Sequence, residues 1–261
     1  MKIPEFAKTV GKKTLFREGS VRTVLWGPCR GMKYKIFPGY GWAYLYGGWE
    51  RHLIQVMRRL IKPGVTVYDL GANYGMHTLL FARIVGGAGH VYAFEPNPEV
   101  FAALQENLRL NSIQSVTPIC KAVSFQTGEA FFDVSQNRAT GHLTHCGLGT
   151  YKVDVTSIDE FVFGQHALPP AFLKIDVEGG ESGVLKGATK VLERYRPTMT
   201  IELHNPDEDR AVGAILKAMN YKAFRIEDGS QVEDLDSGWP NPKGLWGTVS
   251  CVPSEFGSVQ Q

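Results

Sequence analysis

Three polar residues in the second half of the chain stand where they could carry out chemistry together. Asp176 ends a short apolar run that begins at Phe172, and Glu202 and His204 end another run that begins at Thr198. Both runs are predicted strands, and residues two positions apart in a strand point to the same side. Ligands of open α/β sheets bind beyond the carboxyl ends of the strands. We therefore expect Asp176, Glu202 and His204 to meet at one rim of a sheet.

These three residues suit the deprotonation of an acceptor hydroxyl. A histidine with a carboxylate two residues away can act as a general base that the carboxylate orients. We expect His204 to be the base, Glu202 to orient it, and Asp176 to lie near the bound molecules. In one alternative the three side chains bind a divalent cation, Mg²⁺ or Mn²⁺, that lowers the pKa of the hydroxyl. In another, His204 has only a structural role.

A glycine-rich turn organises the first half of the chain. The run 65–70 predicts a buried strand and the run 76–85 predicts a helix, with Gly71 and Gly75 in the turn between them. Glycine allows positive φ and lets a ligand lie against bare backbone, and the helix start offers unpaired N–H groups. Asp69, at the end of the strand, would repel a diphosphate but could receive a cationic amino group.

An acidic residue, Glu95, ends the next predicted strand and lies twenty positions after Gly75. A carboxylate there can accept hydrogen bonds from both hydroxyls of a ribose, so the ligand is predicted to contain a nucleoside. This spacing suits NAD and S-adenosylmethionine equally. The dinucleotide fingerprint Gly-x-Gly-x-x-Gly requires a second glycine where this chain has Ala72, which favours a ligand without a pyrophosphate.

Three motifs in this order resemble the FkbM family of S-adenosylmethionine-dependent methyltransferases. They are Asp69-Leu-Gly-Ala-Asn-Tyr-Gly75, Phe94-Glu-Pro-Asn97 and Leu173-Lys-Ile-Asp-Val-Glu-Gly-Gly-Glu181. The resemblance covers residues 49–203 and implies O-methylation of a small molecule, often a sugar hydroxyl or a polyketide-like natural product. The residues expected to bind S-adenosylmethionine are Tyr46, Glu50, Asp69, Gly71, Ala72, Asn73, Gly75, Glu95, Asn97, Ala122, Val123 and Asp176.

The predicted fold is α/β, a Rossmann-like class I methyltransferase sheet that is mostly parallel and has a late antiparallel hairpin. By resemblance, its strands lie in the order third, second, first, fourth, fifth, seventh, sixth. Residues 178–192 are expected to form one turn and helix after the fourth strand. Residues 1–62, which are rich in aromatic side chains, are expected to form a cap or lid, and residues 63–261 the methyltransferase domain.

An added hairpin is predicted after the third core strand, from residues 129–134 and 151–155. The loop between its strands contains His142, His145 and Cys146. Two histidines three residues apart could face one metal ion, but no third ligand with matching spacing is visible. Contact with the substrate is the favoured interpretation of this loop.

Charge and composition argue against several classes of partner. The chain has 28 basic and 26 acidic residues and a net charge of +2, which gives no strong attraction for nucleic acid or an anionic membrane. Its four cysteines are scattered, and no apolar run has the length of a signal peptide or a membrane span. We expect a cytoplasmic protein with reduced thiols, and no feature predicts its oligomeric state.

Two other functions compete with methyl transfer. The chain could be a binding module that keeps the S-adenosylmethionine site and has lost the chemistry. It could also be an NAD-dependent oxidoreductase, which the missing middle glycine of the fingerprint disfavours. Binding of the two cofactors and turnover would distinguish the three possibilities.

Overall fold

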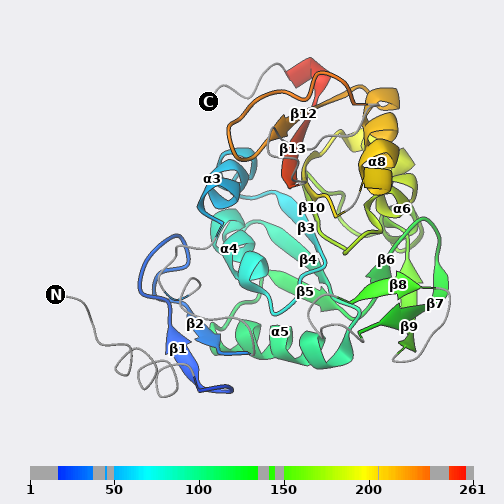
Figure 1. Ribbon diagram of the computed structural model, residues 1–261. Helices are drawn as coiled ribbons and strands as arrows, with labels where there is room; N and C mark the ends of the chain where they lie inside the picture. The colour runs from blue at the N-terminus through cyan, green and yellow to red at the C-terminus, as the bar shows by residue number, and fades with distance from the viewer. Residues whose placement is uncertain are drawn as a thin grey trace, which may run out of the picture.

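The computed structural model of the 261-residue chain describes residues 17–37, 45, 50–134, 141–144, 150–204, 206–235 and 247–256. A seven-stranded sheet forms its centre, in the order β12-β13-β11-β10-β3-β4-β5 (Figure 1). The strands are β3 (Thr66–Leu70), β4 (His90–Phe94), β5 (Val116–Ile119), β10 (Phe172–Ile175), β11 (Thr198–Glu202), β12 (Tyr221–Arg225) and β13 (Thr248–Pro253).

The strand order confirms the predicted fold. β3 pairs in parallel with β4 and β10, β4 with β5, and β10 with β11, whereas β13 runs antiparallel to both β11 and β12. Counted along the chain, the sheet therefore has the order that the resemblance implied, with the late hairpin at one edge. The parallel strands deliver their carboxyl ends to one rim, which is where ligands of such sheets bind.

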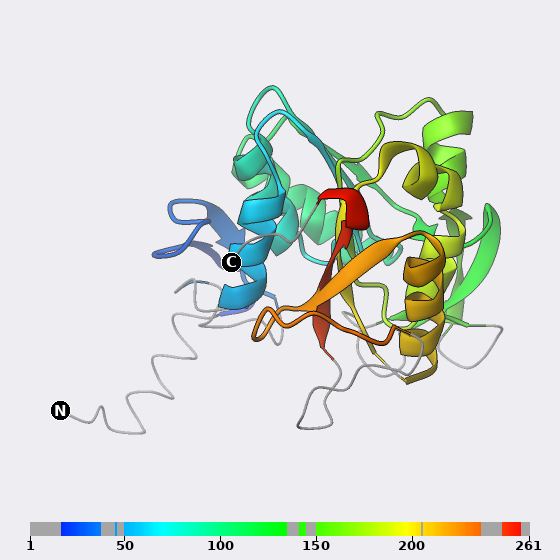
Figure 2. The ribbon, with the colours of Figure 1, turned by 90° about the horizontal axis from the view of Figure 1, so that it is seen from above.

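Helices cover both faces of the sheet because successive residues of each strand point to opposite sides. Val67 packs with α3 (Arg51–Leu60), α4 (Met76–Val85) and α5 (Pro98–Leu110) in one core cluster. Its neighbour Tyr68 packs in a second cluster with α6 (Glu181–Lys186), α7 (Thr189–Tyr195) and α8 (Pro206–Ala218). Figures 1 and 2 show the resulting arrangement, with the two groups of helices on opposite sides of the strands.

The segment predicted as one helix over residues 178–192 is two helices. A turn at Gly187 and Ala188 separates α6 from α7. Gly187 lies so close to the chain before the added sheet that a Cβ there would be 2.2 Å from the carbonyl oxygen of Ser124. This close approach bends the chain, so the prediction of a continuous helix was wrong.

A second, four-stranded sheet lies beside the rim and contains the predicted hairpin. Its order is β6-β9-β7-β8, and β7 pairs antiparallel with β9 as expected. Its strands are β6 (Ala122–Val123), β7 (Gly128–Asp133), β8 (His142–Thr144) and β9 (Thr150–Thr156). The loop that was expected between β7 and β9 therefore includes a strand, β8, which brings His142 to the sheet edge; His145 and Cys146 lie outside the described residues.

The described part of the N-terminal segment packs on the main domain. β1 (Val21–Thr23) and β2 (Lys33–Lys35) form an antiparallel hairpin, and the backbone amide of Lys35 donates a hydrogen bond of 2.9 Å to Asn107 of α5. Tyr34 is buried in the same cluster as Val67. Most of the aromatic residues expected to form a lid lie outside the described residues, so the lid and the domain boundary at residue 62 stay predictions. Within the described part of the chain, none of the helices has the length and apolar character needed to cross a bilayer.

Candidate active site

The turn between β3 and α4 is held against two neighbouring strands. The backbone amides of Gly71 and Ala72 both donate to the carbonyl oxygen of Phe94, at 3.0 and 2.8 Å. Gly71 has a φ of 76°, and a Cβ on it would lie 1.8 Å from the carbonyl oxygen of Asp176. A side chain at position 71 is therefore excluded both by the backbone conformation and by the chain after β10.

Glu95 is positioned by two backbone amides. Its Oε2 accepts a hydrogen bond of 2.9 Å from the amide of Asn73, and its Oε1 accepts one of 2.8 Å from the amide of Asn97. Burial raises the pKa of the Glu95 carboxyl to about 7, although these two hydrogen bonds oppose the shift. The carboxylate is fixed in place at the edge of a pocket, as binding of ribose hydroxyls requires.

A first pocket lies between the rim of the main sheet and the added sheet. Its lining includes the apolar side chains of Phe94, Phe132 and Leu143, which give it a wall suited to a flat aromatic ring. Six of the residues predicted to bind the cofactor line this pocket: Gly71, Asn73, Glu95, Ala122, Val123 and Asp176. The pocket thus combines an apolar wall with a carboxylate, the two features that a nucleoside needs.

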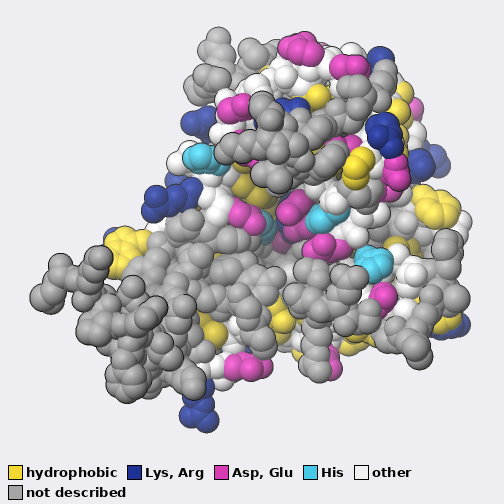
Figure 3. Space-filling view, viewed as in Figure 1, with side chains coloured by type: hydrophobic (Ala, Val, Ile, Leu, Met, Phe, Trp, Pro, Cys, Tyr) yellow, Lys and Arg dark blue, Asp and Glu magenta, His cyan; other side chains and the backbone are white. Residues whose placement is uncertain are grey.

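A second pocket adjoins the first and is more polar. Asn73, Asp176 and Glu178 line both pockets, so the two are continuous around these residues. Glu50 and Glu202 line the second pocket only. Its lining also includes Tyr34, Ala72, His77 and Lys174. Figure 3 shows acidic and histidine side chains gathered in the middle of this face of the molecule.

Lys174 links the glycine turn to the acidic rim. Its Nζ donates a hydrogen bond of 2.8 Å to the carbonyl oxygen of Gly71 and lies 3.4 Å from Asp69 Oδ1 and 3.1 Å from Asp176 Oδ2. Burial alone would lower the pKa of Lys174, but the carboxylates of Asp176 and Asp69 outweigh burial and raise it. The lysine therefore stays charged and binds the two strand ends together.

His204 is surrounded by three carboxylates from the segment after β10. Its Nδ1 lies 2.8 Å from Glu181 Oε1, and its Nε2 lies 3.3 Å from Glu178 Oε2 and 3.7 Å from Asp176 Oδ1. Burial opposes the positive charge, but the hydrogen bond to Glu181 and the nearby carboxylates raise the pKa of His204 to about 9. At neutral pH the imidazole is therefore protonated and can donate from both nitrogens.

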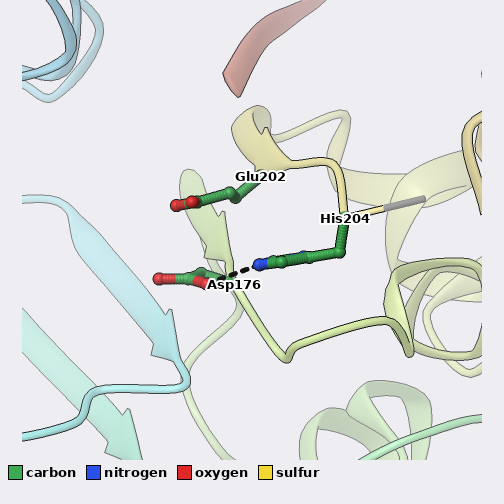
Figure 4. A group of neighbouring side chains, drawn as sticks. All are labelled: Asp176, Glu202 and His204. Carbon is green, nitrogen blue, oxygen red and sulfur yellow. Dashed lines mark ion pairs between the residues drawn. The ribbon is translucent and has the colours of Figure 1, made fainter. Parts of the chain in front are cut away.

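Glu202, like Glu95, is a rim carboxylate that changes its charge near neutral pH. Burial and the neighbouring carboxylate of Asp176 raise the pKa of Glu202 to about 7, against the opposing effect of His204 and Lys174. Figure 4 shows the side chains of Asp176, Glu202 and His204 projecting toward the same space. The predicted meeting of these three residues is found in the structure, but the residue that orients His204 is Glu181 in place of Glu202.

The same three side chains have the donor atoms of a divalent-cation site. One ligand atom from each lies within 4.8 Å of the others. Two cations already compensate these carboxylates, because Lys174 pairs with Asp176 Oδ2 and the protonated His204 pairs with Asp176 Oδ1. A metal ion would have to displace the proton of His204 and compete with Lys174 for Asp176. No step of the reaction is assigned to one.

Several predicted cofactor residues have a different position from the one expected. Asp69 is fully buried and accepts a hydrogen bond of 2.6 Å from Thr78, so it faces Lys174 and α4 and lines neither pocket. Gly75 also lines neither pocket, and a Cβ on it would lie 2.5 Å from Leu104.

Asn97, another of these residues, accepts hydrogen bonds from the amides of Glu99 and Val100 and so caps the start of α5. Tyr46 lies outside the described residues.

Two residues that the sequence interpretation missed are central to the site. Lys174 stands in the apolar run Phe172–Ile175, and a charged residue inside a buried strand was the signal that could have identified it. His77 lies on α4, and its Nε2 is 3.2 Å from Glu50 Oε2. A histidine on a helix face that is otherwise apolar gave little indication of this pairing.

The parallel sheet with its late antiparallel hairpin, the glycine turn and the fixed carboxylate after β4 define a class I S-adenosylmethionine-dependent methyltransferase. The chain belongs to the FkbM methyltransferase family, because the model of the methyltransferase FkbM domain matches residues 69–226. This membership confirms the resemblance and supports a methyltransferase over an NAD-dependent oxidoreductase.

Comparison with known proteins finds similarity to enzymes of this kind. The chain is 30% identical over 167 residues to the hexuronic acid methyltransferase AglP of Haloferax volcanii, covering 64% of this chain and 67% of that protein. It is 41% identical over 68 residues to the 31-O-demethyl-FK506 methyltransferase FkbM of Streptomyces tacrolimicus, covering 26% and 25%. A crystal structure of a putative rRNA-methylase from Clostridium thermocellum has the same fold, with a TM-score of 0.51 at 16% identity, covering 78% of this chain and 93% of that one.

Proposed function

We propose that this protein transfers a methyl group from S-adenosylmethionine to a hydroxyl of a sugar or a natural-product-like small molecule. The observation that carries the proposal is the position of Glu202. This carboxylate lines the second pocket beside Asp176 and His204, and Asp176 also lines the first pocket. A proton acceptor is therefore placed where a hydroxyl could approach a methyl donor that occupies the first pocket.

The two pockets suggest how the cofactor would be held. Glu95 would accept hydrogen bonds from the ribose hydroxyls, and Ala122 and Val123 would pack against the adenine. Glu50 and Asp176, which both line the second pocket, would attract the cationic groups of the methionine end. The excess of acidic side chains in this pocket suits a ligand with a sulfonium and an ammonium group.

The chain's own residues then have two tasks, to align the acceptor and to remove its proton. When bound, S-adenosylmethionine supplies a methyl group on a sulfonium, which is already a strong electrophile. We assign the removal of the proton to Glu202, since a carboxyl with a pKa of about 7 is partly ionised at neutral pH and can accept a proton. His204, protonated and held by Glu181, would donate a hydrogen bond to the acceptor or its neighbour. Glu202 and His204 both stay in the proposed catalytic group, but Glu202 takes the role of base that the sequence suggested for His204.

The names of two relatives support an oxygen acceptor in a small molecule. One relative is named for a hexuronic acid and the other for an oxygen of FK506. In this chain four carboxylates, those of Glu50, Asp176, Glu178 and Glu202, line the second pocket. They would repel an anionic acceptor, so a neutral hydroxyl compound is favoured over a carboxylate.

A product analysis tests the proposal. The protein would be incubated with S-adenosylmethionine and paired acceptors that differ only at one carbon, such as a hexose and the corresponding hexuronic acid. We expect S-adenosylhomocysteine to form with the neutral member and the new methyl group to survive mild alkali, as an ether does. Methylation of the hexuronic acid alone, with a methyl group lost in mild alkali as from an ester, would contradict a hydroxyl acceptor.

The same assay distinguishes an enzyme from a module that only binds the cofactor. Glu202→Gln should remove transfer while largely keeping cofactor binding, because Glu95, Ala122 and Val123, which would hold the nucleoside in the first pocket, are unchanged. Glu193→Gln, a change in an acidic side chain of α7 on the other side of the sheet, is the matched control and should leave both unchanged. Cofactor binding without transfer to any hydroxyl acceptor would favour the binding module.

A further inference from the structure

The hairpin formed by β1 and β2 has two different faces. Tyr34 on its inner face is buried and lines the second pocket. In the antiparallel register Val21 is opposite Lys35 and Thr23 is opposite Lys33, and residues directly opposite share a face. Val21, Thr23 and Lys33 are exposed. The outer face therefore combines apolar and cationic side chains.

The loop after β1 exposes further apolar side chains. Trp26 is 57% exposed, Leu25 45% and Val21 38%, which makes these three half of the large hydrophobic side chains exposed in the described part of the chain. The other three, Phe125, Leu168 and Phe256, lie far apart in the sequence. Tryptophan and neighbouring aliphatic side chains that are exposed on one segment commonly insert at the boundary between lipid headgroups and acyl chains.

The charge of the hairpin is also unlike that of the whole chain. Residues 17–37 contain five basic side chains, namely Arg17, Arg22, Arg30, Lys33 and Lys35, and one acidic side chain, Glu18. Their net charge is +4, whereas the complete chain has a net charge of +2. The positive charge is thus concentrated on the segment that exposes the apolar side chains, a charge distribution that complements anionic lipid headgroups.

We propose that the outer face of the β1–β2 hairpin binds the surface of an anionic membrane. Trp26, Leu25 and Val21 would enter the interfacial region, and Lys33 and Lys35 would pair with lipid phosphates. The hairpin is at an outer edge of the described part of the molecule in both Figure 1 and Figure 2. The net charge of the whole chain gave no reason to expect membrane binding, because it does not reveal that positive charge is concentrated in residues 17–37. The proposed membrane binding does not depend on the proposed acceptor.

A membrane explains the three exposed side chains better than a nucleic acid does. A nucleic acid could stack a base on Trp26, but the branched side chains of Leu25 and Val21 offer no flat surface for stacking. An acyl-chain boundary accommodates all three. The site would then lie beside the membrane surface, because Tyr34 of the same hairpin lines the second pocket.

Sedimentation with vesicles tests this inference. We expect the full chain to sediment with vesicles of equimolar phosphatidylcholine and phosphatidylglycerol, to sediment much less with phosphatidylcholine alone, and to be released by added salt. The double variant Lys33→Gln/Lys35→Gln should bind roughly 25-fold more weakly, since each cation near such a surface contributes about fivefold. Leu25→Ser/Trp26→Ser should bind at least about tenfold more weakly, because burial of their apolar area is lost.

Matched variants elsewhere show whether the hairpin is responsible. Lys186→Gln/Lys190→Gln removes two exposed lysines from the α6–α7 region, and Phe256→Ser removes a side chain that is 62% exposed. Both should bind vesicles like the unchanged protein. Thermal unfolding and S-adenosylmethionine binding of the hairpin variants verify that they are folded. The inference is overturned if anionic vesicles do not bind the protein, if the hairpin variants bind as well as the controls, or if the hairpin variants lose binding only to RNA.

Discussion

The imidazole of His204 lies 2.8 Å from the carboxylate of Glu181, measured from Nδ1 to Oε1, and this carboxylate is completely buried. A buried anion that accepts from Nδ1 keeps the imidazole in its protonated form. We therefore propose that the residue that the sequence suggests as a base is a proton donor at neutral pH, and that the carboxylate of Glu202 is the acceptor.

The pH dependence of kcat/KM should be bell-shaped. Activity rises as the pH increases through about 7, because Glu202 loses its proton and becomes a base. It falls as the pH increases through about 9, because His204 then loses the proton with which it donates a hydrogen bond. Glu202→Gln should lower kcat by about 10²–10⁴-fold and abolish the rising limb. A rising limb that persists in this variant would show that a group other than Glu202 is the base.

Removing the charge of Glu181 should move the other limb. Glu181→Gln keeps an oxygen that can accept from Nδ1 but removes the negative charge that raises the pKa of His204, so the falling limb is expected at a lower pH than in the unchanged protein. Glu178→Gln should move it less, because Glu178 acts only through its charge. The titration of His204 can be followed directly by NMR of the imidazole. An unshifted imidazole pKa in Glu181→Gln would contradict the assignment.

Lys174→Met should destabilise the protein strongly. The buried carboxylate of Asp69, which is 3.4 Å from Lys174 Nζ, would lose its cationic partner, and breaking a buried pair in this way costs about 3–5 kcal/mol. Cofactor affinity should also fall, since Lys174 holds the carbonyl of Gly71. Urea unfolding and calorimetry measure the two effects. Lys222→Met, on the edge strand β12, is the matched control and should change the unfolding free energy little.

EDTA should leave the rate of methyl transfer unchanged. Asp176, Glu202 and His204 could offer ligand atoms to a cation, but Lys174 and the protonated His204 already pair with Asp176. The measurement is the initial rate after dialysis against EDTA and again after addition of Mg²⁺ or Mn²⁺. A loss of activity that either ion restores would show that the cluster holds a metal.

The fold was predictable because its signals are local and repeated. Short apolar runs that end in Asp69, Glu95, Asp176 and Glu202 identified the strands, and the rim followed from their parallel arrangement. This reasoning also brought Asp176, Glu202 and His204 together. The break in the helix at Gly187 depends on the approach of Ser124, a distant part of the chain, so local periodicity could not reveal it.

The partners of individual side chains were less predictable for the same reason. Glu181 is 23 positions from His204 in the chain, and only the packing of α6 beside β11 brings it to Nδ1. Lys174 gains its role from Asp69, which is on a neighbouring strand. Protonation states depend on burial and on all nearby charges together, so the exchange of roles between His204 and Glu202 could not be read from residue spacing.

A calorimetric titration with S-adenosylmethionine tests the central claim most directly. The unchanged protein should bind it saturably and should not bind NAD, and Glu95→Ala should bind S-adenosylmethionine much more weakly because the carboxylate that faces the first pocket is gone. Glu99→Ala, an exposed residue of α5 close by, should bind normally. Full affinity in Glu95→Ala would contradict the placement of the nucleoside, and with it the account of the site built around that pocket.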